Sequence, residues 1–294
     1  MENGFGRLLT AMVTPFTAHG RVDYEKGAEL AEFLVNRGSE GLVVTGTTGE
    51  APTLKEEEKL NLYRAVKERV GRRTRVIAGT GSNSTEETVA LTMKAAETGV
   101  DGIMLVTPYY NKPTQEGLKE HFRLAAAAVP DLPVLLYNVP SRTGVNLGLE
   151  AVLELSRVPN IVALKEAGGD LQQAAGVVLG SRDFTLYSGN DEETLALLAL
   201  GGGGVVSVCS HVAGPQIARM MELFFAGQVQ DALALHRRLM PLFRGLFVAT
   251  NPLPVKAALK MVGMDTGGHR LPLTELEPRL KAALREILVE LDFL

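Results

Sequence analysis

Short runs of apolar and β-branched residues alternate along the chain with longer segments in which apolar residues recur every three or four positions. The longer segments are typical of amphipathic helices, and Leu60, Tyr63, Val66 and Val70 form one such stripe. The short runs are typical of buried strands. Eight strands are therefore predicted, at residues 8–13, 41–45, 75–79, 102–106, 134–138, 161–165, 184–188 and 204–208.

Helices are predicted between these strands, among them residues 24–37, 55–70, 84–98 and 114–128. Gly38, Gly71 and Gly99 follow three of these segments, at the position where a residue in the left-handed conformation commonly ends a helix. Ser84 is followed three residues later by Glu87, which predicts a capping box at the start of the third helix.

Eight strand–helix units of this length predict a (β/α)8 barrel, the TIM-barrel member of the α/β class. The strands are apolar on both faces, as expected for parallel strands that are covered by helices. A doubly wound open sheet is the alternative, but no strand is followed by a complete G-x-G-x-x-G or by a Walker-type phosphate loop.

The pattern changes near residue 215, after which only helical stripes remain, at 217–226, 229–246, 254–262 and 273–291. The first of these stripes is interpreted as the last helix of the barrel. The others predict a small, all-helical appendage. The predicted domains are therefore a catalytic barrel over residues 1–227 and a C-terminal helical domain over residues 228–294.

Composition narrows the class of protein. The formal net charge is −4 and no stretch is strongly basic, which argues against a nucleic-acid or anionic membrane surface. Cys209 is the only cysteine, so no disulfide can form within the chain, and it is expected to be a small buried apolar residue. No targeting signal or membrane span is visible, and a cytoplasmic location is expected.

In an α/β barrel the active site lies at the carboxyl ends of the strands. Lys165 ends the sixth predicted strand, in phase with Ile161 and Ala163 on one face. If that face points inward, the amine is desolvated, its pKa falls, and the neutral form becomes a nucleophile for carbonyl groups. The alternative is an ordinary lysine that reaches out to solvent.

Polar side chains also follow the neighbouring strands. Tyr137 could move protons, Thr47 and Thr48 lie between glycines and could bind a carboxylate, and Arg142 could bind a second carboxylate through its guanidinium. Each residue also has an ordinary structural interpretation, as a packed tyrosine, a plain turn or a solvated arginine.

Metal and serine-hydrolase chemistry receive little support. The five histidines show no H-x-x-x-H or H-E-x-x-H spacing, and no G-x-S-x-G motif is present. Neither a metal nor a cofactor is therefore expected.

Four segments at the strand ends give the chain a family resemblance: Gly46-Thr47-Thr48-Gly49-Glu50, residues 107–113 (TPYYNKP), residues 137–144 (YNVPSRTG) and Lys165-Glu166-Ala167. With Thr10-Ala11-Met12-Val13-Thr14-Pro15-Phe16, they are similar to the dihydrodipicolinate synthase family. These proteins are pyruvate-dependent class I aldolases, a group that also contains N-acetylneuraminate lyase. The resemblance covers nearly the whole chain.

The resemblance implies a role for each candidate. Lys165 would form a Schiff base with pyruvate. Tyr137, Thr47 and Tyr110 would form a proton relay, with Tyr110 supplied by a neighbouring subunit of a homotetramer. Thr48 would bind the pyruvate carboxylate.

Three further residues complete the implied site. Arg142 would receive the carboxylate of aspartate semialdehyde, and the backbone carbonyls of Gly189 and Val206 would line the pyruvate pocket.

The implied reaction is the condensation of pyruvate with L-aspartate 4-semialdehyde to 4-hydroxy-tetrahydrodipicolinate, the first committed step towards diaminopimelate and lysine. An aldolase for N-acetylneuraminate or a 2-keto-3-deoxy sugar acid is the first alternative, and Arg142 argues against it because a polyol partner has no carboxylate there. A barrel that binds a keto acid without catalysis is a more remote alternative.

The resemblance also bears on regulation, because lysine inhibits many family members at a site beside the tyrosine pair. Asn83, Glu87 and Tyr109 match contacts to the inhibitor, whereas Glu56 and Lys59 replace two histidines of sensitive relatives. Lys59 would repel the ammonium groups of the ligand, and Glu56 and Lys59 could pair with each other across one helical turn. We expect weak or absent inhibition by lysine.

Overall fold

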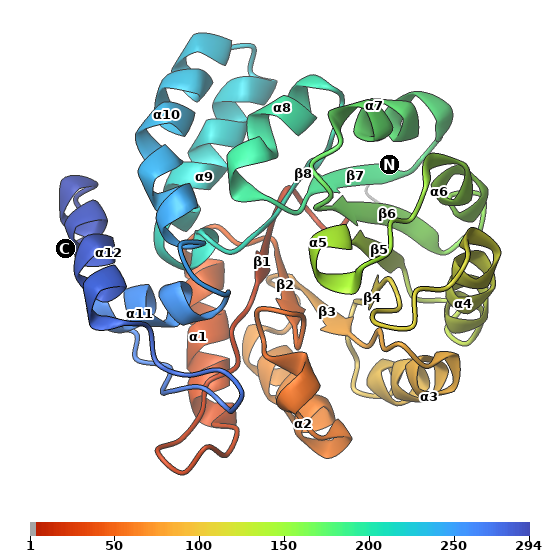
Figure 1. Ribbon diagram of the computed structural model, residues 1–294, viewed down its shortest axis with the longest axis horizontal. Coiled ribbons are helices and arrows are strands. Elements are labelled where there is room, and N and C mark those ends of the chain that lie inside the picture. The colour runs from red at the N-terminus through yellow and green to blue at the C-terminus, as the bar shows by residue number, and fades with distance from the viewer. Residues whose placement is uncertain (1–3) are drawn as a thin grey trace.

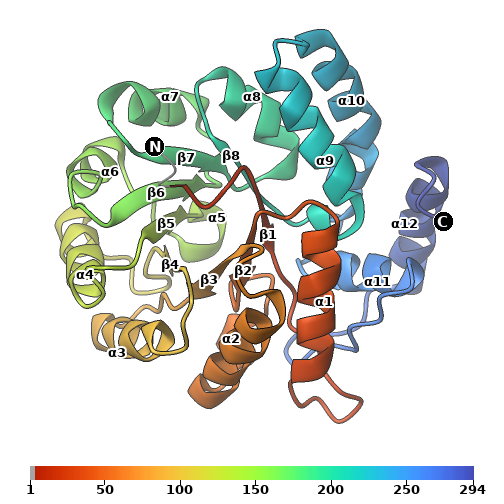
Figure 2. The ribbon, with the colours of Figure 1, turned by 180° about the vertical axis from the view of Figure 1, so that it is seen from behind.

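The computed structural model describes residues 4–294. Eight parallel strands close into a barrel in chain order, as the hydrophobic pattern predicts (Figures 1 and 2). Most predicted strand bounds are met within one or two residues. The strands are β1 (Leu8–Ala11), β2 (Gly41–Val44), β3 (Arg75–Gly79), β4 (Gly102–Val106), β5 (Val134–Asn138), β6 (Ile161–Glu166), β7 (Thr185–Ser188) and β8 (Gly204–Ser207).

Helices surround this barrel and cover the outer faces of its strands (Figure 1). Residues of β2 and β5 are buried without exception, because each strand faces helices on one side and the barrel interior on the other. The helices and short 3-10 turns of the barrel are α1 (Tyr24–Asn36), η1 (Ala51–Thr53), α2 (Glu56–Val70), α3 (Thr85–Ala96), α4 (Gln115–Ala127), α5 (Pro140–Thr143), α6 (Leu149–Leu155), α7 (Leu171–Gly180), η2 (Asp191–Glu193), α8 (Thr194–Ala199) and α9 (Ser210–Phe225).

Three helices lie outside the barrel beside α9 and α1: α10 (Val229–Gly245), α11 (Leu253–Met261) and α12 (Pro278–Glu290) (Figures 1 and 2). Two predicted bounds are wrong here. The helix expected from residue 217 begins at Ser210, with a kink at Ala213 and Pro215 inside it. The last helix begins at Pro278 rather than at 273, because proline favours the first turn of a helix.

The helix ends follow their local signals with one exception. Gly38, Gly71 and Gly99 all have positive φ, as predicted for residues that end helices. The Ser84 side chain accepts a hydrogen bond from the Glu87 N–H at the start of α3, but the carboxylate of Glu87 bonds the Ser82 hydroxyl at 2.9 Å instead. The predicted capping box is therefore only half formed.

Cys209 is free and buried, as expected for a small apolar residue. Within residues 4–294, no helix is long and apolar enough to cross a membrane.

Candidate active site

The candidate lysine and tyrosine lie side by side because of strand register. Tyr137 of β5 is directly opposite Lys165 of β6. The Lys165 Nζ atom lies 4.2 Å from the centre of the Tyr137 ring, and each residue is only 5% exposed. The alternative in which Lys165 reaches out to solvent is therefore wrong.

Burial changes the acid–base behaviour of this amine. Desolvation lowers the pKa of Lys165 from its ordinary 10.5 to about 7; the negative charge of Asp191 opposes the shift and the positive charge of Arg142 adds to it. A substantial fraction of the amine is thus neutral near neutral pH, and the neutral amine is the form that attacks a carbonyl carbon.

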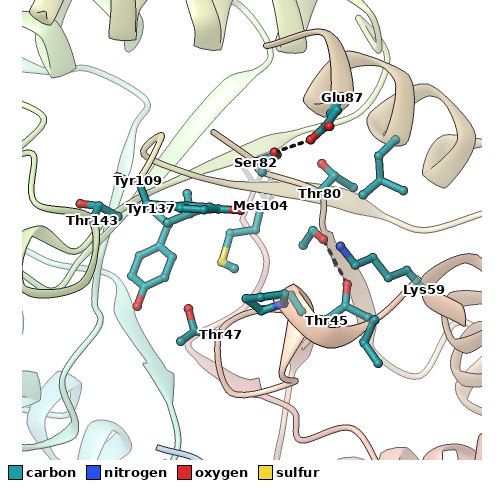
Figure 3. A pocket seen from close by; sticks show the side chains of 18 of the residues that line it. Thr45, Thr47, Lys59, Thr80, Ser82, Glu87, Met104, Tyr109, Tyr137 and Thr143 are labelled. Carbon is teal, nitrogen blue, oxygen red and sulfur yellow. Dashed lines mark hydrogen bonds between the residues drawn. The ribbon is translucent and has the colours of Figure 1, made fainter. Parts of the chain in front are cut away.

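Tyr137 remains a protonated phenol at neutral pH, because burial raises its pKa. The positive charge of Arg142 and the Thr47 hydroxyl oppose that rise. The hydroxyls of Tyr137 and Thr47 point toward one another across the cavity (Figure 3). A phenol beside the lysine, with a second hydroxyl at its tip, can transfer protons to and from the reacting atoms.

The loop after β2 has an unusual backbone. Thr45 and Glu50, which bracket it, have φ values of 56° and 55°, in the left-handed region that residues other than glycine rarely adopt. The Thr14 hydroxyl donates to the carbonyl of Gly49 at 2.6 Å, and Thr48 within the loop is 3% exposed. Tertiary contacts must hold this loop, because the strained residues cost free energy.

Glu50 supplies the main contact. Its carboxylate is buried and bonds Lys256 Nζ at 2.9 Å, His269 Nδ1 at 3.3 Å and the Arg270 N–H at 3.1 Å. Although burial alone raises the pKa of Glu50, His269 and Lys256 hold it below its ordinary value. Thr48 is held from the same side, since Asn251 Nδ2 donates to Thr48 Oγ1 at 2.8 Å.

Tyr110 does not join the other candidates within this chain. Its side chain is 87% exposed, its φ is 74°, and its N–H donates to the carbonyl of Thr143 at 3.2 Å. Arg142 lies on the short helix α5 and lines the cavity in front of Tyr137.

Gly189 and Val206 lie at the ends of β7 and β8. A Cβ atom on Gly189 would lie 2.6 Å from Ala167 Cβ and 3.1 Å from Lys165 Cε, so only glycine fits beside the lysine. Val206 is fully buried and pairs with Leu9 of β1.

The cavity in front of Tyr137 has a volume of about 650 Å³, and the residues that line it do not include Lys165, Thr48, Gly189 or Val206. Thr47, Tyr137 and Arg142 line it, and so do four of the residues that the resemblance associates with lysine inhibition: Glu56, Lys59, Glu87 and Tyr109. In Figure 3, Lys59 and Glu87 lie on the opposite side of the view from Tyr137, whereas Tyr109 lies beside Tyr137.

The predicted pairing of Glu56 with Lys59 is not formed. Glu56 Oε1 instead bonds Lys94 Nζ of α3 at 2.6 Å. Burial lowers the pKa of Lys59, while the charges of Glu87 and Glu56 oppose the shift. Asn83 lies apart from the cavity lining, and its carbonyl accepts a hydrogen bond from Asn111 Nδ2 at 2.8 Å.

Sequence reasoning missed two groups of buried residues around the site. Asp191 accepts hydrogen bonds from the Ser207 hydroxyl and from the N–H groups of Val208 and Cys209 at 3.0 and 3.1 Å, and so ties η2 to β8. Its place after the seventh strand was the available signal. Asn251 and Lys256 lie beyond the barrel, where the strand-end rule does not apply. The described part of the chain holds no cluster of three or more His, Cys, Asp or Glu side chains arranged for a metal.

A (β/α)8 barrel with a desolvated lysine at a strand end is the architecture of enzymes that attack carbonyl groups through a lysine amine. The model of the dihydrodipicolinate synthetase family matches residues 4–291. The chain therefore belongs to the dihydrodipicolinate synthetase family, as its resemblance implied.

Relatives and solved structures agree with this assignment. The 4-hydroxy-tetrahydrodipicolinate synthase of Cyanothece sp. is 53% identical over 291 residues, covering 99% of each chain. The enzyme of the same name from Symbiobacterium thermophilum is 54% identical over 288 residues, covering 97% of this chain and 98% of the relative. A lysine-bound crystal structure of the dihydrodipicolinate synthase from Cyanidioschyzon merolae superposes with a TM-score of 0.97 at 49% identity, covering 99% of each chain. The chloride-inhibited synthase of Acinetobacter baumannii, complexed with pyruvate, has a TM-score of 0.95 at 38% identity, covering 99% of this chain and 100% of that one.

Proposed function

We propose that this protein condenses pyruvate with L-aspartate 4-semialdehyde to 4-hydroxy-tetrahydrodipicolinate, in the cytoplasm, at the first committed step towards diaminopimelate and lysine. The observation that carries the proposal is the buried Lys165, with a pKa of about 7, stacked on Tyr137 at the rim of the barrel. The shared name of relatives more than half identical in sequence supports the choice of substrates.

The reaction begins when the neutral Lys165 amine attacks the ketone carbon of pyruvate. The resulting carbinolamine loses water and becomes an iminium ion, which loses a proton from its methyl carbon to give an enamine. The enamine carbon attacks the aldehyde of aspartate semialdehyde and forms a carbon–carbon bond. The amino group of the adduct then attacks the iminium carbon, closes the ring and releases Lys165 as the free amine.

Tyr137 and Thr47 transfer the protons that these steps require, to the carbinolamine hydroxyl as it leaves as water and to the new alkoxide as it becomes a hydroxyl. Thr48 binds the pyruvate carboxylate through its hydroxyl and backbone N–H. Arg142, at the cavity surface, binds the carboxylate of the semialdehyde through a bidentate pair. Gly189 and Val206 line the pyruvate pocket through their backbone carbonyls.

The working unit is an oligomer. Tyr110 is the third member of the relay, yet its side chain is 87% exposed on a strained backbone in the single chain. In the proposed homotetramer of barrels, this tyrosine enters the site of a neighbouring subunit and completes it.

Borohydride reduction in the presence of pyruvate tests the mechanism. A reduced pyruvyl adduct on Lys165, identified by peptide mass, is expected. The Lys165→Ala protein should give no adduct and no turnover. Turnover by the unmodified protein above this control would dismiss a barrel that merely binds keto acids. An adduct on another residue would overturn the mechanism.

A substrate panel separates the proposal from a sugar-acid aldolase. Arg142→Ala should weaken use of aspartate semialdehyde by about 1.5–3 kcal/mol, the contribution of a hydrogen bond to a charged group, and should affect pyruvate trapping less, through the loss of a charge that lowers the pKa of Lys165. Faster turnover of N-acetylneuraminate or a 2-keto-3-deoxy sugar acid than of the semialdehyde by the unmodified protein would favour the alternative.

A further inference from the structure

The side chain of Asn251, in the segment before α11, contacts the loop after β2 (residues 45–50), here called the substrate loop. It is 6% exposed, and its Nδ2 donates to Thr48 Oγ1 at 2.8 Å. Within residues 4–294, this is the one hydrogen bond that the Thr48 hydroxyl makes, and Asn251 Oδ1 has no partner. Buried amides normally form hydrogen bonds through both the NH2 group and the oxygen, so a buried amide that bonds only one hydroxyl requires an explanation.

The chemistry of the two groups fixes the direction of the Thr48 hydroxyl. An amide NH2 only donates, so the Thr48 oxygen must accept this bond. The hydroxyl has one proton, which is then free to be donated elsewhere. With the amide reversed, Thr48 would donate to Asn251 Oδ1 and present only an oxygen to a substrate carboxylate, which it would repel.

Neighbouring contacts hold the C-terminal segment against this loop. Lys256 of α11, five residues after Asn251, forms the buried pair with Glu50, two residues after Thr48. The same ammonium group donates to the carbonyl of Gly268 at 2.6 Å and lies 4.4 Å from the centre of the Phe16 ring. The C-terminal segment that contains Asn251 and Lys256 therefore contacts the loop at both Thr48 and Glu50.

We propose that Asn251 is a positioning residue for the keto acid: it orients the Thr48 hydroxyl as a hydrogen-bond donor toward the substrate carboxylate. The inference rests on the proposed function, in which Thr48 binds that carboxylate. Asn251 acts through Thr48 and needs no contact with substrate.

Asn251→Asp and Asn251→Ala distinguish orientation from packing. Aspartate has nearly the shape of asparagine, but its carboxylate accepts a hydrogen bond from the Thr48 hydroxyl and brings a negative charge toward the substrate. Borohydride trapping over a range of pyruvate concentrations should show half-saturation raised by about 5- to 10-fold in Asn251→Ala and by more than about 30-fold in Asn251→Asp. Hydroxyacetone, a ketone without a carboxylate, should be trapped at unchanged concentrations in both variants.

A double-mutant cycle tests whether the effect passes through Thr48. Thr48→Val alone should weaken pyruvate capture, and adding Asn251→Ala to it should change half-saturation by less than about twofold. This cycle also carries the test if Asn251→Asp does not fold. Thermal unfolding serves as the check that each variant retains its barrel.

Three results would overturn the proposal: equal losses for pyruvate and hydroxyacetone, an aspartate variant no weaker than the alanine variant, or full additivity in the cycle. Each would assign Asn251 an ordinary packing role. Failure of the proposed function is distinguishable, because the unmodified protein would then form no pyruvate adduct on Lys165.

Discussion

The burial that makes the Lys165 amine reactive also destabilises the folded protein. An amine that is 5% exposed and has a pKa of about 7 is held where its charged form is disfavoured. The unfolded chain keeps that proton up to about pH 10.4, so unfolding takes up a proton at the pH values in between. Stability therefore rises with pH across this interval, and below pH 7 the folded protein bears the full cost of a buried cation.

Replacing the lysine by an apolar residue of similar length should therefore stabilise the protein. Lys165→Met is expected to raise the free energy of unfolding by roughly 3–5 kcal/mol at pH 6, because one pKa unit corresponds to about 1.4 kcal/mol. The gain should shrink as pH rises from 7 to 10. Urea denaturation at fixed protein concentration measures it, with Lys55→Met as the control at an exposed position. A gain that does not change with pH would contradict the shifted pKa.

Among single residues, the sequence predicted those that lie at the ends of strands, where strand periodicity and the position of barrel active sites apply. Lys165, Tyr137 and Thr47 lie together at the barrel rim, as expected. Asn251 could not be predicted, because its partner Thr48 lies 203 residues away and no local pattern connects the two.

The elements were predictable wherever an apolar run or a helical stripe is uninterrupted, which holds for all eight strands. Errors occur where two signals compete. The helix was predicted to begin at residue 217, yet α9 begins at Ser210 and continues through Pro215 with a kink at Ala213. Glu87 could cap its own helix but bonds Ser82 instead, a choice that depends on the folded loop.

Packing between β6 and β7 leaves no room for a side chain at Gly189. Gly189→Ala would bring a methyl group within 2.6 Å of Ala167 Cβ and 3.1 Å of Lys165 Cε. We expect a destabilisation of about 1–3 kcal/mol from overpacking, with a loss of turnover because the lysine is displaced. Gly117→Ala in α4 is the control, since its nearest neighbour lies at an ordinary 3.4 Å. Thermal unfolding and borohydride trapping measure the two effects, and a Gly189 variant as active as the control would refute the argument.

For the molecule as a whole, the eight-fold alternation was enough to predict the barrel, and the family assignment is confirmed over residues 4–291. The division between domains at residue 228 stays a prediction. The homotetramer also stays a prediction, because the group that Tyr110 contacts in a neighbouring subunit is inferred from the resemblance.

A shared site makes a specific prediction about mixtures of variants. Tyr110→Phe and Lys165→Ala should each be nearly inactive. When the two proteins exchange subunits, some sites receive both an intact Lys165 and an intact Tyr110 from a neighbour, so part of the activity should return. Native mass spectrometry verifies exchange, and exchange without recovered turnover would count against a shared relay.

Regulation is the remaining prediction at this scale. Lys59 lines the cavity and presents a like charge to the ammonium groups of lysine, and Glu56 is engaged by Lys94. A lysine titration of the steady-state rate should therefore give half-inhibition above about 1 mM, which corresponds to binding weaker than about 4 kcal/mol. Lys59→His should lower that concentration. Half-inhibition well below a millimolar in the unmodified protein would show that Glu87 and Tyr109 suffice.

The contacts between the C-terminal segment and the substrate loop determine when, during synthesis, the loop can be held in place. Thr48 and Glu50 emerge from the ribosome 203 and 206 residues before Asn251 and Lys256. At about 5–20 residues per second, that interval is roughly 10–40 s. A nascent chain can finish all eight strands and still lack the side chains that hold its strained loop. The contacts that hold the substrate-binding loop are therefore completed only in the last part of synthesis.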